Sequence, residues 1–142
     1  MQPADFRYPV RVYYEDTDAG GIVYNANYLK FLERARTEWL RERGVEQDEW
    51  LRQDVAFVVR HIDIDFHRAA RFNQMLSVTC VIQELKRASV IFTQQIQDER
   101  GQQLVSARVT IACVSLSQMR PTAFPEVIKG VFSSGTHSTV VY

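Results

Sequence analysis

The sequence predicts an α+β fold in which an antiparallel sheet of about five strands wraps around one long helix. A long segment near the N-terminus carries apolar residues at three- and four-residue spacing, which is the pattern of an amphipathic helix. One strand-like segment precedes it and four alternating segments follow it. Because a single helix must bury its apolar stripe against the sheet, we expect this helix to lie at the centre.

A chain of 142 residues, 46% of them hydrophobic, has room for one core, and we expect residues 1–142 to form a single domain. The 17 basic and 17 acidic residues balance, which argues against a dedicated nucleic-acid binder. No apolar run approaches the ~20 residues of a membrane span, and residues 1–6 lack the pattern of a secretory signal. Cys80 and Cys113 form neither a disulfide framework nor a zinc pattern, so a cytoplasmic location is the simplest expectation.

The N-terminal half of the chain supplies the first strand and the helices. Residues 8–15 alternate between two faces and predict a strand, and residues 16–24 predict a turn in which Gly20 and Gly21 allow tight backbone geometry. The long helix is predicted over residues 26–43, where Asn25 or Asn27 can cap its start and Gly44 can end it. A second, shorter helix is predicted over residues 47–53.

The C-terminal half supplies the remaining strands. Alternation and β-branched residues predict strands over residues 55–66, 75–86, 88–98 and 104–116. Residues 98–101 predict a hairpin turn, residues 84–88 a tight connection and residues 68–74 a polar loop. A helical turn is expected over residues 126–132, and residues 133–142 are expected to be a mobile tail.

The segment with the clearest chemistry is residues 14–24, Tyr-Glu-Asp-Thr-Asp-Ala-Gly-Gly-Ile-Val-Tyr. It brings the Asp18 carboxylate to the start of the long helix, where the first N–H groups lack internal partners and carry partial positive charge. Such N–H groups can polarise a carbonyl oxygen, and a nearby carboxylate can act as nucleophile or general base. The alternative is that Asp18 only caps the helix or closes the turn.

This segment, together with Asn27-Tyr28 and residues 31–36 (Phe-Leu-Glu-Arg-Ala-Arg), resembles the signature of the 4-hydroxybenzoyl-CoA thioesterase family. The closer similarity is to its Tol–Pal-associated acyl-CoA thioesterase branch, the YbgC type, and it extends over most of the chain. The resemblance implies a hotdog fold and hydrolysis of acyl-CoA thioesters, with no metal. It also implies a homodimer or homotetramer with the active site between subunits, and possible Tol–Pal or lipid-synthesis partners.

By position in this signature, Asp18 matches the catalytic aspartate of the family. Asn25 matches the residue whose backbone N–H points at the thioester carbonyl, and Gly21, Val23 and Tyr24 fall among the substrate-binding positions. The YbgC-type branch usually has histidine where this chain has Asn25. An amide cannot exchange protons near neutral pH as an imidazole can, but it still donates hydrogen bonds, and the backbone N–H is unchanged.

The phosphate groups of coenzyme A, which is part of the substrate rather than a bound cofactor, require cationic partners. Five basic residues lie at turns or in the C-terminal region and are candidates: Arg68, Arg71, Lys86, Arg87 and Arg120. Lys86 and Arg87 are the first choices because the adjacent strand ends hold them in place. The rival to an enzyme is a low-turnover acyl-CoA-binding or scaffold protein of the same fold.

Other polar residues favour structural roles. His61, Asp63, Asp65 and His67 share one face of a strand, and a solvated sheet face explains them better than a metal site. Asp16 is expected to be a turn residue or to accept hydrogen bonds from nearby backbone N–H groups, and Glu33 to be a surface carboxylate or a partner of Arg36. The two cysteines are expected in the core, and Ser115 and Ser117 lack the context of a catalytic serine.

Overall fold

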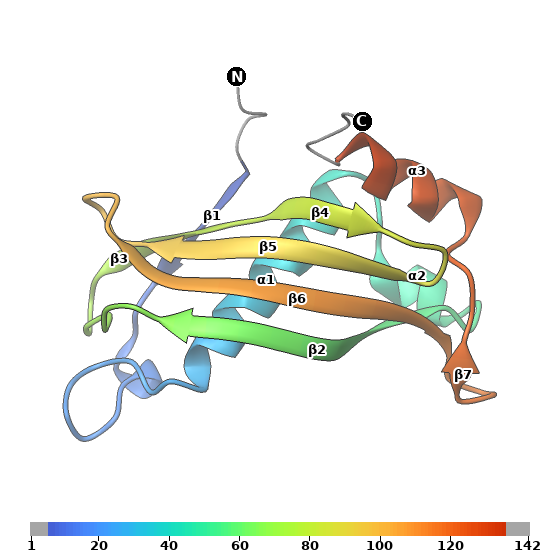
Figure 1. Ribbon diagram of the computed structural model, residues 1–142. Coiled ribbons are helices and arrows are strands. Elements are labelled where there is room, and N and C mark those ends of the chain that lie inside the picture. Colours follow the sequence, from blue (N-terminus) through green and yellow to red (C-terminus); the bar gives the residue numbers. More distant parts are fainter. Residues whose placement is uncertain (1–5, 136–142) are drawn as a thin grey trace. The chain divides into compact units, whose positions relative to one another are not determined.

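The computed structural model describes residues 6–135 (Figure 1). In chain order the elements are β1 (Arg7–Arg11), the 3-10 helix η1 (Tyr14–Asp16), α1 (Asn27–Glu42), α2 (Gln47–Leu51), β2 (Ala56–Phe66), β3 (Met75–Thr79), β4 (Val81–Leu85), β5 (Ser89–Gln97), β6 (Gln103–Ser115), β7 (Arg120–Pro121) and α3 (Glu126–Ser134). The sheet has the order β1-β3-β5-β6-β2, with β4 also on β5 and β7 on β6. An antiparallel sheet with one long helix is the α+β hotdog fold expected from the sequence.

The described residues group into two compact units. The first ends at Trp39 and also contains Ile64–Cys80 and Gln94–Ala107. The second consists of Leu40–Asp63, Val81–Thr93 and the residues from Arg108 onward. Each unit is therefore built from segments far apart in the sequence. None of the helices in residues 6–135 is long and apolar enough to cross a membrane.

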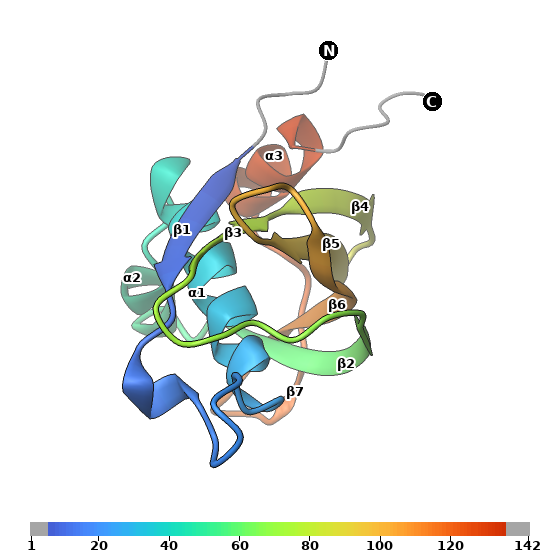
Figure 2. The same ribbon diagram turned by 90° about the vertical axis from the view of Figure 1, so that its left-hand side faces the viewer.

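In the first unit, the apolar stripe of α1 is buried as predicted. Its side chains at three- and four-residue spacing are almost inaccessible: Tyr28, Phe31, Leu32, Ala35 and Trp39. Strands β1 and β3 lie side by side (Figure 2) and pair antiparallel. The register runs from Arg7 opposite Thr79 to Arg11 opposite Met75, and the two strands bury Val10, Leu76 and Val78. Burial of this much apolar surface is the main stabilising contribution in a core of this kind.

A buried polar group also lies in the first unit. The Arg36 guanidinium, on α1, donates to Gln94 Oε1 (3.0 Å), and the Gln94 amide donates to the Leu32 carbonyl (3.1 Å) and to the Cys80 sulfur (3.3 Å). Burial lowers the pKa of Arg36 from its ordinary value. Because Gln94 is itself fully buried, its amide ties α1 to β5 with specific geometry.

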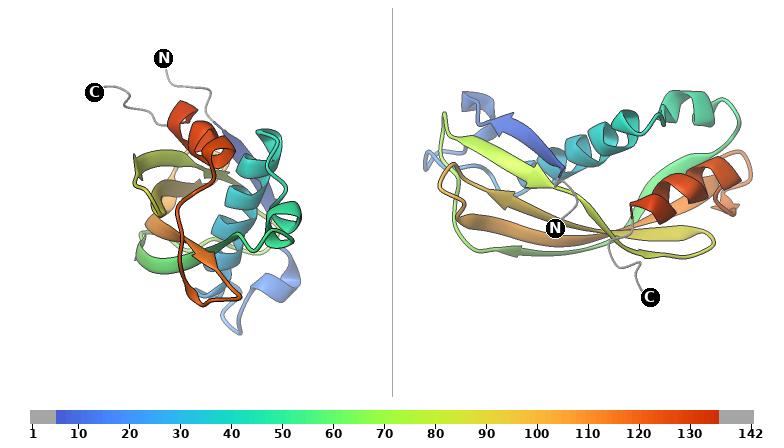
Figure 3. Two further views of the ribbon diagram at one scale, coloured as in Figure 1. Left: turned by 90° about the vertical axis from the view of Figure 1, so that its right-hand side faces the viewer. Right: turned by 90° about the horizontal axis from the view of Figure 1, so that it is seen from above.

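In the second unit, α3 packs its aromatic side chain into a cluster. The Phe132 ring lies 5.1 Å from Phe124, 6.0 Å from Phe92 and 6.3 Å from Phe57, measured between centroids. Figure 3 shows the chain passing from β7 into α3. The helical turn predicted over residues 126–132 is thus a helix of nine residues with Ile128 and Phe132 fully buried.

Several predicted boundaries are wrong. The first strand ends at Arg11 rather than at residue 15, because Tyr14–Asp16 forms a 3-10 turn closed by the Asp16 N–H on the Tyr13 carbonyl (3.0 Å). Residues 75–86, predicted as one strand, form the two strands β3 and β4, which are separated at Cys80. Next to this break the Gln95 N–H donates to the Thr79 hydroxyl (3.0 Å) instead of to a backbone carbonyl of the sheet. Of the tail predicted to be mobile, Ser133 and Ser134 belong to α3, and residues 136–142 lie outside the described residues.

Asp54 joins the end of α2 to the turn after β6 in the second unit. Its carboxylate accepts hydrogen bonds from the Ser115 hydroxyl (2.5 Å), the Ser117 hydroxyl (2.6 Å) and the Ser117 N–H (3.0 Å). Donors of this kind favour the charged form, and the Ser115 hydroxyl contributes most. The pKa of Asp54 is therefore lowered to about 2 from its ordinary value of 3.8.

This shift predicts a specific loss of stability in acid. A carboxyl whose pKa is lower in the folded state stabilises the fold above its unfolded pKa, and this stabilisation is lost as the pH falls through the folded value. We expect Tm to fall more steeply between about pH 4 and pH 2 in the parent than in Asp54→Asn, measured by circular dichroism. Asp48→Asn, at an exposed site on α2, should keep the parent slope, and equal slopes for all three proteins would contradict the prediction.

Candidate active site

Asp18 lies at the base of a tight turn in the first unit. The Asp18 N–H donates to the Ile22 carbonyl (2.9 Å), the Gly21 N–H donates to the Asp18 carbonyl (3.0 Å), and Thr17 and Val23 form an isolated bridge. Gly21 has φ of +80°, in the region that favours glycine. This turn leaves the Asp18 side chain exposed.

The Asp18 carboxylate has one occupied and one open oxygen. Its Oδ1 accepts a hydrogen bond from the Gly20 N–H (2.8 Å), and no residue in the described part of the chain donates a hydrogen bond to Oδ2. A Cβ at position 20 would lie 3.3 Å from Oδ1, so glycine there gives this bond the space it needs. The turn thus orients the carboxylate and leaves an oxygen for chemistry.

Backbone hydrogen bonds hold this turn against the loop that follows β2. The Val23 N–H donates to the Ala70 carbonyl (2.9 Å), and Ile22 forms a bridge with Arg71. The Ala70 N–H in turn donates to the Tyr28 hydroxyl (2.9 Å), and burial raises the pKa of that phenol above its ordinary value of 10. The Asp18 turn, the loop after β2 and α1 are therefore linked directly.

The start of α1 offers open backbone donors. The helix begins at Asn27, one residue later than predicted, and the Asn25 carbonyl accepts the Tyr28 N–H (3.3 Å). Within residues 6–135 the N–H groups of Asn25 and Ala26 donate to no acceptor. The Asn25 side chain is exposed. These two N–H groups lie at the positive end of the helix dipole, as the sequence predicted for Asn25.

Asp16 holds the helix start in place. It is almost completely buried, its Oδ2 accepts the Tyr13 N–H (2.8 Å), and its Oδ1 accepts the Asn27 side-chain amide (2.9 Å). Asp16 therefore lies in a turn and accepts a backbone N–H, which are the two alternatives predicted for it. Its bond to Asn27 was not predicted, because the sequence places the two residues eleven positions apart with no pattern that links them.

Comparison with known proteins gives the family. A family model described as the thioesterase-like superfamily matches residues 12–132. The chain belongs to this superfamily. It is similar to the acyl-CoA thioesterase YbgC of Haemophilus influenzae (47% identity over 128 residues, 89% of this chain and 93% of that protein).

Two further similarities agree. The acyl-CoA thioester hydrolase YbgC of Escherichia coli O157:H7 is 44% identical over 132 residues, which cover 93% of this chain and 98% of that protein. The crystal structure of a probable thioesterase from Bartonella henselae matches with a TM-score of 0.76 at 36% identity, over 86% of this chain and 99% of that chain. The family inferred from residues 14–36 is confirmed.

The predicted substrate-binding residues of this thioesterase-superfamily chain fall into two groups. The first group, in the Asp18 turn, consists of Gly21, Val23 and Tyr24. Tyr24 is exposed, while Val23 is buried and its N–H donates to the loop after β2. Lys86 and Arg87 lie between β4 and β5 in the second unit. There the Lys86 N–H donates to the Ser89 carbonyl (2.8 Å), and the Lys86 ammonium lies 3.7 Å from Glu84 Oε2. The role of these residues in substrate binding stays a prediction.

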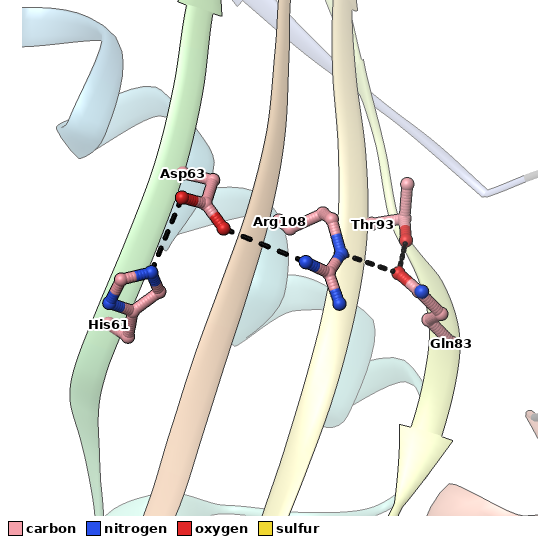
Figure 4. Close-up of polar contacts among 5 residues, drawn as sticks. All are labelled: His61, Asp63, Gln83, Thr93 and Arg108. Atoms are coloured by element: carbon pink, nitrogen blue, oxygen red, sulfur yellow. Dashed lines mark hydrogen bonds and ion pairs between the residues drawn. The ribbon is translucent and has the colours of Figure 1, made fainter.

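Two of the polar residues predicted on one face of β2, His61 and Asp63, lie in an exposed chain of contacts with neighbouring side chains. In the second unit, His61 Nε2 lies 3.3 Å from Asp63 Oδ1, and Asp63 Oδ2 lies 3.6 Å from Arg108, which also donates to Gln83 (3.1 Å) (Figure 4). Thr93 completes this exposed chain of contacts by donating to Gln83 (2.8 Å). No cluster of three or more metal-ligating side chains occurs in the described part of the chain.

The remaining reactive side chains have structural surroundings. Cys80 and Cys113 are buried, as expected of core residues, and burial raises the pKa of the Cys113 thiol to about 11. Glu33 is an exposed carboxylate that accepts the Thr37 hydroxyl (2.9 Å). Ser115 and Ser117 donate to Asp54, and a serine that donates to a carboxylate without a histidine is not an activated nucleophile.

Proposed function

We propose that the chain hydrolyses acyl-CoA thioesters, with Asp18 as nucleophile or general base and the Asn25 N–H as donor to the thioester carbonyl oxygen. The observation that carries this proposal is the pairing, in one anchored loop, of an exposed carboxylate with open N–H groups at a helix start. Relatives that are 44–47% identical carry the names acyl-CoA thioesterase and acyl-CoA thioester hydrolase, which supports the same activity here.

The proposed chemistry follows from the charges. As the carbonyl carbon is attacked, negative charge grows on its oxygen, and fixed N–H donors at a helix start stabilise that charge without reorganising. In one route Asp18 Oδ2 forms a bond to the carbonyl carbon, the thiolate of coenzyme A leaves, and water opens the mixed anhydride. In the other route Asp18 takes a proton from the water that attacks. Neither route requires a bound cofactor.

The direct test is release of the coenzyme A thiol from acyl-CoA substrates of several chain lengths, followed with a thiol reagent. Multiple turnovers on at least one substrate would support the proposal. Binding of acyl-CoA without thiol release would overturn it in favour of the rival, a low-turnover binding or scaffold protein. The absence of the usual histidine at position 25 is the feature that favours this rival.

We further propose that the protein acts as a homodimer or homotetramer in the cytoplasm. The strand β2 is the last in the order of the sheet, and its Val58 and Val59 are exposed apolar residues. An unpaired edge of this kind is usually covered by another strand, here that of a second copy.

Buried cysteines without a disulfide fit a reducing compartment. Tol–Pal or lipid-synthesis partners rest on the resemblance alone.

Asn25→His tests whether the side chain at position 25 has a role beyond its backbone. Because the Asn25 side chain is exposed and lies before the helix, the fold should be unchanged. If an imidazole assists proton transfer, kcat rises and its pH profile gains a step near pH 6.5. We expect this gain, measured as kcat from pH 5 to 9, with Asn25→Gln as the control that should keep the parent profile. An unchanged profile in the histidine variant would assign the position a backbone role only.

A further inference from the structure

A cavity of about 580 Å³ lies in the first unit between two connections of the sheet. One wall is the loop after β2, which contributes Arg68 and Arg71, and the other is the turn between β5 and β6, which contributes Asp98, Glu99 and Arg100. The volume is in the range of small-molecule sites. Neither Asp18 nor Asn25 is among the residues that line it.

The charges around the cavity favour an anion. Arg68, Arg71 and Arg100 form no ion pair with any residue in the described range. The Asp98 carboxylate is already engaged, because its Oδ1 accepts the N–H groups of Arg100 and Gln102 (both 2.9 Å). The lining of the cavity therefore includes three arginines without an ion-pair partner in the described range and two acidic residues, one of which is held by its own turn. A guanidinium fork matches the oxygens of a phosphate group.

Hydrogen bonds hold the backbone on both sides of the cavity. The Leu104 carbonyl accepts the N–H groups of His67 (2.7 Å) and Arg68 (3.1 Å), and the Gln74 side chain accepts the Arg71 N–H (2.7 Å). On the other side the Asp98 N–H donates to the Gln102 carbonyl (3.0 Å). Fixed backbones under three arginines reduce the ordering cost that binding would otherwise incur.

The cavity is also connected to the Asp18 turn. Arg71, which lines it, forms a bridge with Ile22, and the neighbouring Ala70 carbonyl accepts the Val23 N–H. We propose that this cavity binds a phosphate group at the nucleotide end of the acyl-CoA substrate, through Arg68, Arg71 and Arg100. The inference rests on the proposed function. An anionic membrane surface is a poorer ligand for this cavity, because a flat surface does not fit a concave site and its negative charges would be repelled by Asp98 and Glu99.

The test compares two substrates that share the reacting thioester. An acyl-CoA carries the phosphate groups, and the matching acyl-pantetheine does not. In the double variant Arg71→Gln/Arg100→Gln we expect KM for the acyl-CoA to rise about 10-fold or more, because each arginine supplies charge-assisted hydrogen bonds. We expect kcat to stay within about twofold of the parent, and KM for the acyl-pantetheine to stay unchanged. The control Arg43→Gln/Arg52→Gln removes two charges from the other unit and should leave both KM values unchanged.

Three outcomes would overturn the inference. In the double variant, KM could rise equally for the two substrates, or both KM values could stay at the parent level. Alternatively, the control Arg43→Gln/Arg52→Gln could raise KM for the acyl-CoA as much as the double variant does. Failure of the proposed function is seen separately, because the parent would then release no thiol from either substrate. In that case calorimetric binding of coenzyme A and of 3′-dephospho-coenzyme A to the parent and to the double variant still tests the cavity. Loss of coenzyme A binding in the variant would support it, and equal binding would overturn it.

Discussion

Replacing Asp18 by asparagine is expected to lower thioester turnover by at least about 10²-fold, because the nucleophile or base is lost while the fold remains. The asparagine oxygen can still accept the Gly20 N–H, so the turn is preserved. The open N–H groups at the helix start are untouched, so acyl-CoA should bind with nearly parent affinity. Thiol release gives the rate, calorimetry gives the affinity and a thermal melt gives the stability.

Glu33→Gln is the matched control for this variant. Glu33 is also an exposed carboxylate of the first unit, and it accepts a hydrogen bond from the Thr37 hydroxyl, which a glutamine oxygen can accept equally well. We expect this variant to keep parent turnover. If Asp18→Asn is folded, binds acyl-CoA and hydrolyses it at the parent rate, Asp18 is structural. The reacting carboxylate would then have to be sought elsewhere, and Glu33 is the next to test.

Phe132→Ala is expected to give the largest loss of stability, about 3–5 kcal/mol, which is typical of a fully buried phenylalanine. The Phe132 side chain is 0% exposed and meets three other aromatic rings, so its removal takes apolar surface from the core and leaves a cavity. Urea unfolding followed by circular dichroism measures the change in the free energy of unfolding.

Val127→Ala in the same helix separates burial from helix content. Its side chain is 66% exposed, and surface substitutions of this kind usually change stability by less than about 0.5 kcal/mol. If both variants lose only this small amount, α3 does not belong to the cooperatively folded core. A large loss from Phe132→Ala alone would show that the C-terminal helix completes the second unit.

The long helix was predicted to within one residue at each end, because burial of one face imposes a period that the sequence must carry. The same dependence on periodicity explains why the break between β3 and β4 was not predicted. Leu76, Val78, Cys80 and Ile82 are all buried at alternate positions, so the alternation runs through the break without a change. The bond between Thr79 and the Gln95 N–H lies at the break, and such a contact has no local signal in the sequence.

The candidate site divides in the same way. Asp18 and its glycines lie within a few residues of one another, so their chemistry can be read from a short stretch. Arg100 was predicted to be part of a hairpin turn, which it is, and nothing near it in the sequence indicates that it lines the same cavity as Arg68 and Arg71. That arrangement depends on two loops that are about thirty residues apart in the chain and meet only in the folded protein.

The way in which the Asp18 turn is fastened has a consequence for how this scaffold can change. Its attachments to the loop after β2 are made by backbone groups: Val23 to Ala70, and nearby Val12 to Gln74 and Asn73 to Val12. Such bonds are the same whatever side chain a residue carries, provided that it is not proline. The exposed side chains of this region can therefore be exchanged during evolution or in the laboratory without loss of the backbone bonds that hold the turn.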